Sequence, residues 1–204
     1  MSSAPTSPQP GTDPETGPPR YLAWSVRYTD HVADVCCTPR GRADLTTGLT
    51  RNGLSEPWLM LPHLQARMPR ASHLKIAYLA VAAMYADQAP NPTASTQSPP
   101  TTYDPGHGNF GWSLARAKRA GVLQEDHCTT LLQRLARIRK LDAFLKQLQP
   151  EVSRLANKNV PISWPHLLRD LTRWPQYRTS VTDEWMTSLY MPSKIDDELQ
   201  GFSA

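Results

Sequence analysis

The chain has 204 residues, a formal net charge of +4 and a hydrophobic content of 39%, so it can bury one sizeable core or two small ones. No stretch approaches the roughly 20 apolar residues that a membrane-spanning helix needs, which argues against a membrane protein. Three cysteines, two of them adjacent, make a poor disulfide framework, so we expect a reduced, cytoplasmic protein.

The first 19 residues contain six prolines and almost no apolar side chain. Such a segment cannot bury enough surface to offset the entropy of ordering it, so we predict a disordered tail over residues 1–19. The tail lacks the basic and apolar regions of a secretory signal.

Helical patterns follow from residue 21 onwards. Apolar residues at helical spacing predict a first helix over 21–37, and the sequence Thr-Pro-Arg-Gly is expected to break it. We predict a short second helix over 42–50 and a loop with a helical turn over 54–64. Residues 70–88 are apolar over much of a helical circumference, which predicts a buried helix.

Residues 89–107 form a second proline-rich stretch, with five prolines. Such a long structureless insert is uncommon within a compact domain, and is usually functional or mobile. It could separate two domains, but neither flank alone has much core. We therefore favour one helical domain over 20–191 with a flexible loop, followed by an acidic tail over 192–204.

The second half of the chain is also helical in pattern. Ser113 is a good N-cap for a helix over 114–120, which ends at the following glycine. Apolar residues at steps of three and four then predict helices over 124–139 and 141–157, joined as one bent helix or two, with Pro150 as a kink or restart. This apolar stripe consists of Leu131, Leu135, Ile138, Leu141, Leu145 and Leu148.

Two more helices are expected near the C-terminus. Ser163 can cap one of them, and Val181, Trp185 and Leu189, at steps of four, indicate the last. No stretch combines strand alternation with hairpin signals. The predicted fold is therefore all-α, a compact bundle of roughly eight or nine helices.

Tryptophan and aspartate side chains in this region have two interpretations each. Trp164, Trp174 and Trp185 could stack on nucleic-acid bases, but their helical spacing with leucines favours core packing. Asp170 directly follows Arg169 and lies three residues before Arg173, so we expect it to pair with these arginines on the helix surface.

Little in the sequence supports a catalytic or metal site. His127 and Cys128 are neighbours, and adjacent helical side chains point about 100° apart, so they cannot form a nucleophile–base pair. His107, between two glycines, lacks companion ligands. The motifs of phosphate loops, zinc proteases and serine hydrolases are absent. We expect no enzyme activity, no metal and no cofactor.

Positive charge is concentrated between residues 113 and 158. This segment has ten basic and four acidic side chains, a net charge of +6, so the rest of the chain sums to −2. Basic residues along helices suit a groove that follows a nucleic-acid backbone. The alternative is a solvated helix face whose long basic side chains flank the apolar stripe.

Several weak motifs occur in a fixed order. They read GNFGWSLARAKRAG, LLQRLARIRKLDAFLKQL, PISWPHLLRDLTRW and VTDEWMTSLY, preceded by PRGRADLTTGL and the apolar helix around 74–85. In this order they resemble the CasB family, the small subunits of the type I-E CRISPR surveillance complex Cascade. The resemblance covers roughly residues 21–191 and skips both proline-rich segments.

The resemblance implies a non-catalytic helical subunit, present in two copies beside other Cascade subunits, guide RNA and target DNA, with no membrane association. Members of this family hold the displaced DNA strand through basic residues, so the implied function is to stabilise the R-loop. Exchanging a DNA duplex for an RNA–DNA hybrid is nearly balanced in free energy, so extra backbone contacts can decide the outcome.

Matching motif positions imply nucleic-acid contacts on several helices. The chain departs from the family pattern at Thr46-Thr47 and at Asp126-His127, where basic pairs are usual, and neighbouring arginines could substitute for them. The candidate nucleic-acid-binding residues are Arg40, Arg42, Arg51, Arg116, Arg119, Arg134, Arg137, Arg139 and Lys146.

Two other functions stay open from the sequence. The chain could be a purely structural subunit whose basic face docks on acidic protein partners. It could also be an independent DNA-binding regulator, for which Ala120-Gly121 is the one candidate turn of a helix-turn-helix.

Overall fold

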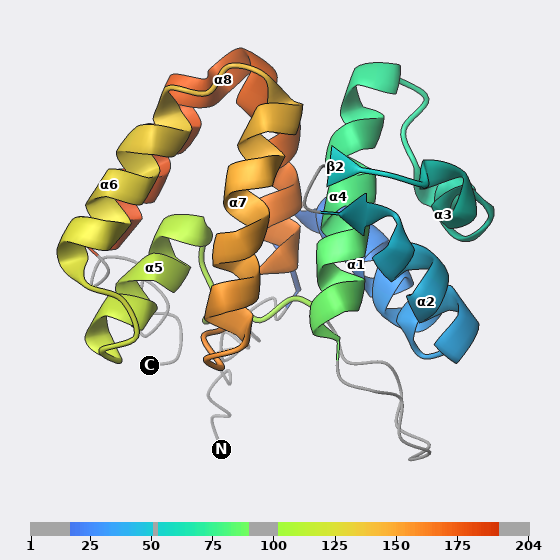
Figure 1. The fold of residues 1–204 in the computed structure, drawn as a ribbon, viewed down its shortest axis with the longest axis horizontal. Coiled ribbons are helices and arrows are strands. Elements are labelled where there is room, and N and C mark those ends of the chain that lie inside the picture. The colour runs from blue at the N-terminus through green and yellow to red at the C-terminus, as the bar shows by residue number, and fades with distance from the viewer. Residues whose placement is uncertain (1–16, 51–52, 90–101, 192–204) are drawn as a thin grey trace, which may run out of the picture.

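The computed structural model describes residues 17–50, 53–89 and 102–191. Within these ranges the chain forms eight α-helices, one 3-10 helix and a hairpin of two two-residue strands, which confirms the predicted all-α fold (Figure 1). Nearly all of the predicted N-terminal tail, most of the proline-rich insert and the acidic tail lie outside the described residues.

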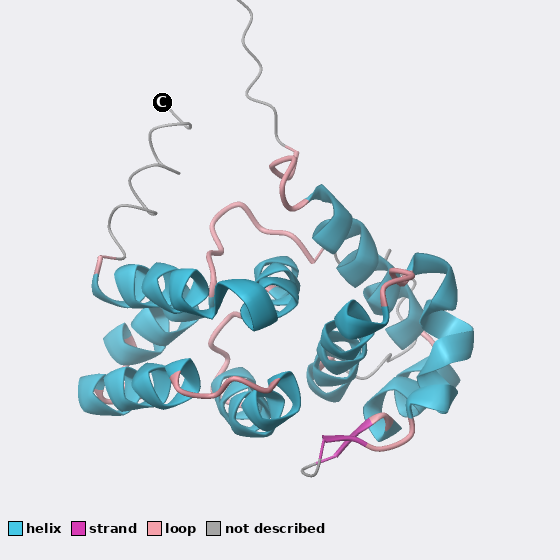
Figure 2. Ribbon diagram, turned by 90° about the horizontal axis from the view of Figure 1, so that it is seen from above, coloured by secondary structure: helices cyan, strands magenta, loops and turns pink. Residues whose placement is uncertain are grey.

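Four helices make up the N-terminal half, and the short hairpin lies among them. The elements are α1 (Ala23–Cys36), α2 (Pro39–Thr47), β1 (Leu49–Thr50), β2 (Gly53–Leu54), α3 (Pro57–Leu64), the 3-10 helix η1 (Gln65–Arg67) and α4 (Ser72–Gln88). The C-terminal half contains α5 (Phe110–Arg119), α6 (Glu125–Ala136), α7 (Leu141–Ala156) and α8 (Trp164–Tyr190). Viewed from above, the helices form two groups, with the hairpin at the edge (Figure 2).

The start of α2 and the whole of α3 differ from the prediction. Thr38 caps α2, because its hydroxyl accepts a hydrogen bond from the Gly41 amide at 3.1 Å, so the helix begins at Pro39 rather than at residue 42. The segment predicted as a loop is the helix α3. Pro62 removes one of its hydrogen bonds, and the fully buried Met60 and Leu64 offset that loss.

α5 begins four residues earlier than predicted. Asn109 is its N-cap, and the side-chain oxygen accepts from the Trp112 amide at 3.2 Å. Ser113, the predicted cap, is buried inside the helix, where its hydroxyl donates to the Pro161 carbonyl at 2.9 Å. Both residues are good caps, so the burial of Phe110 in the first turn decides between them.

The apolar stripe is divided between two helices. Residues 137–140 separate α6 from α7, and Pro150 lies inside α7 without ending it. Of the stripe, Leu131, Leu135, Leu145 and Leu148 are buried, and Ile138 and Leu141 pack against the core from its edge.

One hydrophobic cluster extends through both halves of the molecule. Trp174 and Trp185 lie within it, and their rings contact Phe144 with centroids 3.9 and 6.2 Å away. Trp164 packs edge-on against Tyr85 at 5.5 Å. The core role predicted for these tryptophans is therefore confirmed for Trp174 and Trp185, and Trp164 is partly buried.

α8 is two helices joined at a kink. Tyr177 has φ −123° and ψ 32°, outside the helical region. Figure 1 shows that α8 bends at the top of the view. This accounts for the two separate helices predicted here.

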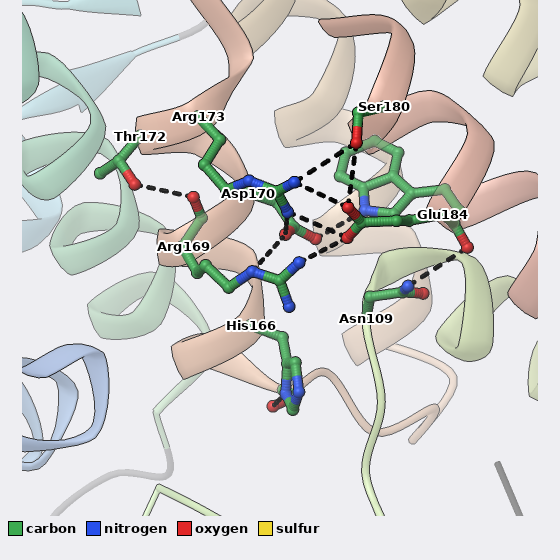
Figure 3. A network of polar contacts seen from close by, with 10 residues as sticks. Asn109, His166, Arg169, Asp170, Thr172, Arg173, Ser180 and Glu184 are labelled. Carbon is green, nitrogen blue, oxygen red and sulfur yellow. Dashed lines mark hydrogen bonds and ion pairs between the residues drawn. The ribbon is translucent and has the colours of Figure 1, made fainter. Parts of the chain in front are cut away.

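A polar network joins the two halves of α8 (Figure 3). Arg169 and Arg173 on the first half reach Glu184 on the second, at 2.5 and 2.7 Å. Asp170 is fully buried and accepts a hydrogen bond from the Trp185 indole at 2.7 Å. The prediction that Asp170 lies on the surface was therefore wrong, because the kink folds the second half of α8 over it. Its ion pairs with Arg169 and Arg173, at 3.6 and 3.9 Å, are the local ones expected.

Candidate nucleic-acid interface

The predicted contact residues lie on three separate parts of the surface. Arg40 and Arg42 are on α2, in the N-terminal half, and Arg51 lies outside the described residues. Arg116 and Arg119 are on the last turns of α5. The remaining residues belong to the α6–α7 hairpin, which here denotes the two antiparallel helices and their link; they are Arg134, Arg137, Arg139 and Lys146.

The two arginines of α2 differ in how far they are engaged within the fold. Arg42 donates from Nε to the Ala86 carbonyl at 3.1 Å, so it neutralises the end of α4. Arg40 is exposed, 3.8 Å from Asp44. The hydroxyls of Thr46 and Thr47, which stand where charge was expected, donate to carbonyls of their own helix. On α2, Arg42 is therefore engaged within the fold, whereas Arg40 is an exposed positive charge with one carboxylate nearby.

A basic groove lies between α5 and the segment that follows α7. It has a volume of about 330 Å³, and no acidic side chain is among its lining residues, Arg116, Arg119, Ala120, Lys158, Asn159, Val160 and Pro161. Arg116 lies over the Trp112 ring, 5.0 Å from its centroid, which fixes its guanidinium at the groove.

Lys158 was not among the predicted contact residues. Asn159 adopts a left-handed conformation, φ 55°, and turns the chain after α7 back towards α5. This turn brings Lys158 beside two arginines roughly 40 positions earlier. An Asn after a run of helix is the sequence signal of such a turn, because Asn tolerates positive φ.

The α6–α7 hairpin exposes further basic side chains. Arg137, Arg139 and Lys146 are exposed, and none of them is ion-paired with a carboxylate in the described part of the chain. α7 has 16 residues, so its two ends lie roughly 24 Å apart. The link and the basic groove at the far end of α7 are therefore two distinct sites of positive charge.

One carboxylate lies between the two helices of the hairpin. Glu151 is 3.3 Å from His127 Nε2, 3.9 Å from Arg134 and 4.0 Å from Arg154. His127 thus contributes to a basic cluster at a position where the sequence departs from the CasB pattern. Arg154 was missed by the motif comparison.

The residues first considered for catalysis are otherwise occupied. Cys128 is buried, which raises the pKa of its thiol, while the neighbouring His127 points to Glu151. His107 lies 3.4 Å from Asp104 and against the ring of Trp112, and burial lowers its pKa. In residues 17–50, 53–89 and 102–191, no three His, Cys, Asp or Glu side chains are placed to hold a metal ion. None of the helices in these ranges combines the length and the hydropathy that a membrane-spanning segment requires.

The sequence matches the family model of CRISPR-associated protein Cse2 over residues 41–190. The chain belongs to the Cse2 family. The match begins at Gly41 and ends at Tyr190, so it includes Arg42, the basic groove and the α6–α7 hairpin, and leaves out Arg40. The resemblance to the CasB small subunits is thereby confirmed.

Solved structures agree with membership of the Cse2 family. One chain of a "CRISPR RNA-guided surveillance complex" has a TM-score of 0.67 and 25% identity, over 90% of this chain and 99% of that one. A chain of such a complex described as pre-nicking has a TM-score of 0.66 and 24% identity, over 90% and 99%. The M. ruber CasB crystal structure has a TM-score of 0.60 and 21% identity, over 88% and 97%. The last two show a common fold alone. No curated protein matches this Cse2-family chain significantly.

Proposed function

We propose that this chain is a non-catalytic subunit of an RNA-guided surveillance complex, which binds nucleic-acid backbone and holds the displaced strand of the target DNA. The observation that carries the proposal is the set of exposed basic side chains without carboxylate partners in the described residues, Arg137, Arg139 and Lys146 on the α6–α7 hairpin. Membership of the Cse2 family points to the same role.

The charge distribution suits contact with phosphates rather than with base edges. Sequence-independent binding to a single strand needs a positive surface that follows the backbone. The tryptophans Trp174 and Trp185, which could have stacked on bases, are in the core. Replacing a DNA duplex with a hybrid is nearly balanced in free energy, so backbone contacts to the freed strand favour the open state.

The basic groove of α5 and the link of the α6–α7 hairpin are the two contact regions that we assign. Each presents exposed arginines, Arg116 and Arg119 in the first and Arg137 and Arg139 in the second. The assembly that we propose contains guide RNA, target DNA and other Cascade subunits, with two copies of this chain as one helical domain over 20–191, and is cytoplasmic.

The test is to reverse charge on the hairpin in the assembled complex. We expect Arg137→Glu with Arg139→Glu to weaken retention of the displaced strand by at least about tenfold at low salt, and to flatten the log–log salt dependence by about 0.7 for each lost phosphate contact. Gel-shift titration over a salt series measures both quantities. The matched control is Arg67→Glu with Arg70→Glu, an equal charge change on exposed residues beside α3.

The same experiment tests the alternative that the chain is a purely structural subunit whose basic face docks on protein partners. If the hairpin reversals prevent the other subunits from co-purifying before any DNA is added, the basic face docks on protein. Binding that does not change with salt, with or without the reversals, would overturn the proposal.

A further inference from the structure

Four polar side chains of the α6–α7 hairpin form what we call the Glu151 cluster: His127, Arg134, Glu151 and Arg154. Glu151 comes from α7 and is 13% exposed, whereas the two arginines, one from each helix, are about half exposed, at 51% and 49%. A single carboxylate thus lies beneath two arginines that face solvent.

The arginines approach Glu151 by charge rather than by hydrogen bonding. Their nitrogens are 3.9 and 4.0 Å from its oxygens, well beyond the roughly 2.7–2.9 Å of a charge-assisted hydrogen bond. The closest contact of Glu151 is with His127 Nε2, at 3.3 Å. Arg154 also lies 3.4 Å from that nitrogen. Most N–H donors of both guanidinium groups are therefore left for another acceptor.

Two guanidinium groups on neighbouring helices suit a phosphate. Each carries five donors in a planar fork that can bind phosphate oxygens through two parallel hydrogen bonds. The carboxylate below them supplies only a charge, and it is placed where it lowers the positive potential that a phosphate would experience. Surface ion pairs at such separations contribute little to stability, so holding α6 against α7 is a weak reason for this arrangement.

We propose that Arg134, Arg154 and His127 form a subsite for one phosphodiester group of single-stranded nucleic acid, and that Glu151 keeps this subsite weak. The inference rests on the proposed function and adds to it an internal attenuator of binding. A subunit that holds a strand only until the next step gains from such a limit, because each added contact slows release.

The size of the effect follows from Coulomb's law. A unit charge about 6 Å from a bound phosphate, at effective dielectric constants between about 40 and 80, changes the affinity by about three- to tenfold. We therefore expect Glu151→Gln to tighten binding by this factor. The log–log salt slope should steepen by about 0.7, because one more phosphate is fully neutralised.

The experiment is fluorescence anisotropy of the full chain with a labelled oligothymidylate of about 30 nucleotides, over a salt series. Asp34→Asn is the matched control, since it removes the same charge from an exposed position on α1, outside both assigned contact regions. We expect the control to change affinity less than twofold. Adding Arg134→Gln and Arg154→Gln to Glu151→Gln should remove the gain.

Each outcome decides the inference. No tightening in Glu151→Gln, or equal tightening in Asp34→Asn, would overturn the subsite while leaving salt-dependent binding by the wild type in support of the proposed function. If Glu151→Gln fails to fold, Arg134→Gln with Arg154→Gln in the presence of Glu151 must still weaken binding and flatten the slope. If no variant, wild type included, binds with salt dependence, the proposed function fails together with the subsite.

Discussion

Gly111 has no side chain, and this allows α5 to pack closely against the backbone of α8. A Cβ at Gly111 would lie 2.0 Å from the carbonyl oxygen of Trp185, and backbone at that position cannot move aside. We expect Gly111→Ala to lower the free energy of unfolding by about 1–3 kcal/mol through overpacking. Denaturant unfolding measures the loss. Gly106→Ala is the control, because its Cβ would meet only the exposed carboxylate of Asp104 at 3.2 Å; equal midpoints for both variants would contradict this explanation.

At the residue scale, contacts between residues that are close in the sequence can be predicted, whereas contacts between residues far apart in the sequence cannot. The pairing of Asp170 with Arg169 and Arg173 follows from helical spacing and is confirmed. Its burial depends on Trp185, 15 residues later, which reaches Asp170 only because of the kink in α8. In the same way, the contact between His127 and Glu151 depends on how α6 and α7 are aligned, which no local pattern encodes.

At the element scale, apolar periodicity predicts most of the helices but not all of their bounds. The apolar stripe correctly gives α6 and α7, because burial of one face determines both. The segment 54–64, predicted as a loop with a helical turn, forms the helix α3, and Pro57 at its first position favours a helix. The start of α5 was shifted because Asn109 and Ser113 are both good caps, and only tertiary packing selects the first.

The first half of α8 carries one buried and one partly buried group, Asp170 and His166, whose protonation has opposite effects on stability. Burial raises the pKa of Asp170 to about 6 and lowers the pKa of His166 to about 4. Below pH 6 the folded chain binds a proton at Asp170 that the unfolded chain, with a usual pKa near 3.8, does not, so acid stabilises the fold there. Below about pH 6.5 the unfolded chain binds a proton at His166 that the folded chain excludes, so acid destabilises the fold.

Replacing one of the two groups should therefore reveal the pH dependence of stability that the other contributes. Relative to wild type, we expect the melting temperature of Asp170→Asn to fall as the pH decreases from 7 to 5, and that of His166→Gln to rise. The amide oxygen of Asn can still accept from the Trp185 indole, so the hydrogen bond is kept. Circular dichroism melts across this range provide the measurement. Differences from wild type that do not vary with pH would show that neither group titrates as its burial requires.

At the scale of the whole molecule, α4 connects the two groups of helices. It is buried from Ala77 to Met84, and its alanines allow neighbouring helices to approach on several sides. The positions of the charges follow from this packing: α5, α6 and α7 lie on one side of the bundle and α2 on the other (Figure 1). The sequence predicts that positive charge is concentrated in residues 113–158. Only the folded structure shows that this charge is divided between the basic groove and the α6–α7 hairpin.

A continuous core predicts that both halves unfold together. Met60 is fully buried in the N-terminal half, and Met60→Ala should cost about 2–5 kcal/mol, through lost burial and the cavity left behind. In a two-state protein this loss lowers every probe's midpoint by the same amount. Four of the six tryptophans, Trp112, Trp164, Trp174 and Trp185, lie in the C-terminal half, so their fluorescence reports on the helices that Met60 does not belong to. We expect fluorescence and helicity to shift to the same new midpoint. A fluorescence midpoint that stays at the wild-type value would mean that the two halves are separate domains, and that the insert is a linker between them.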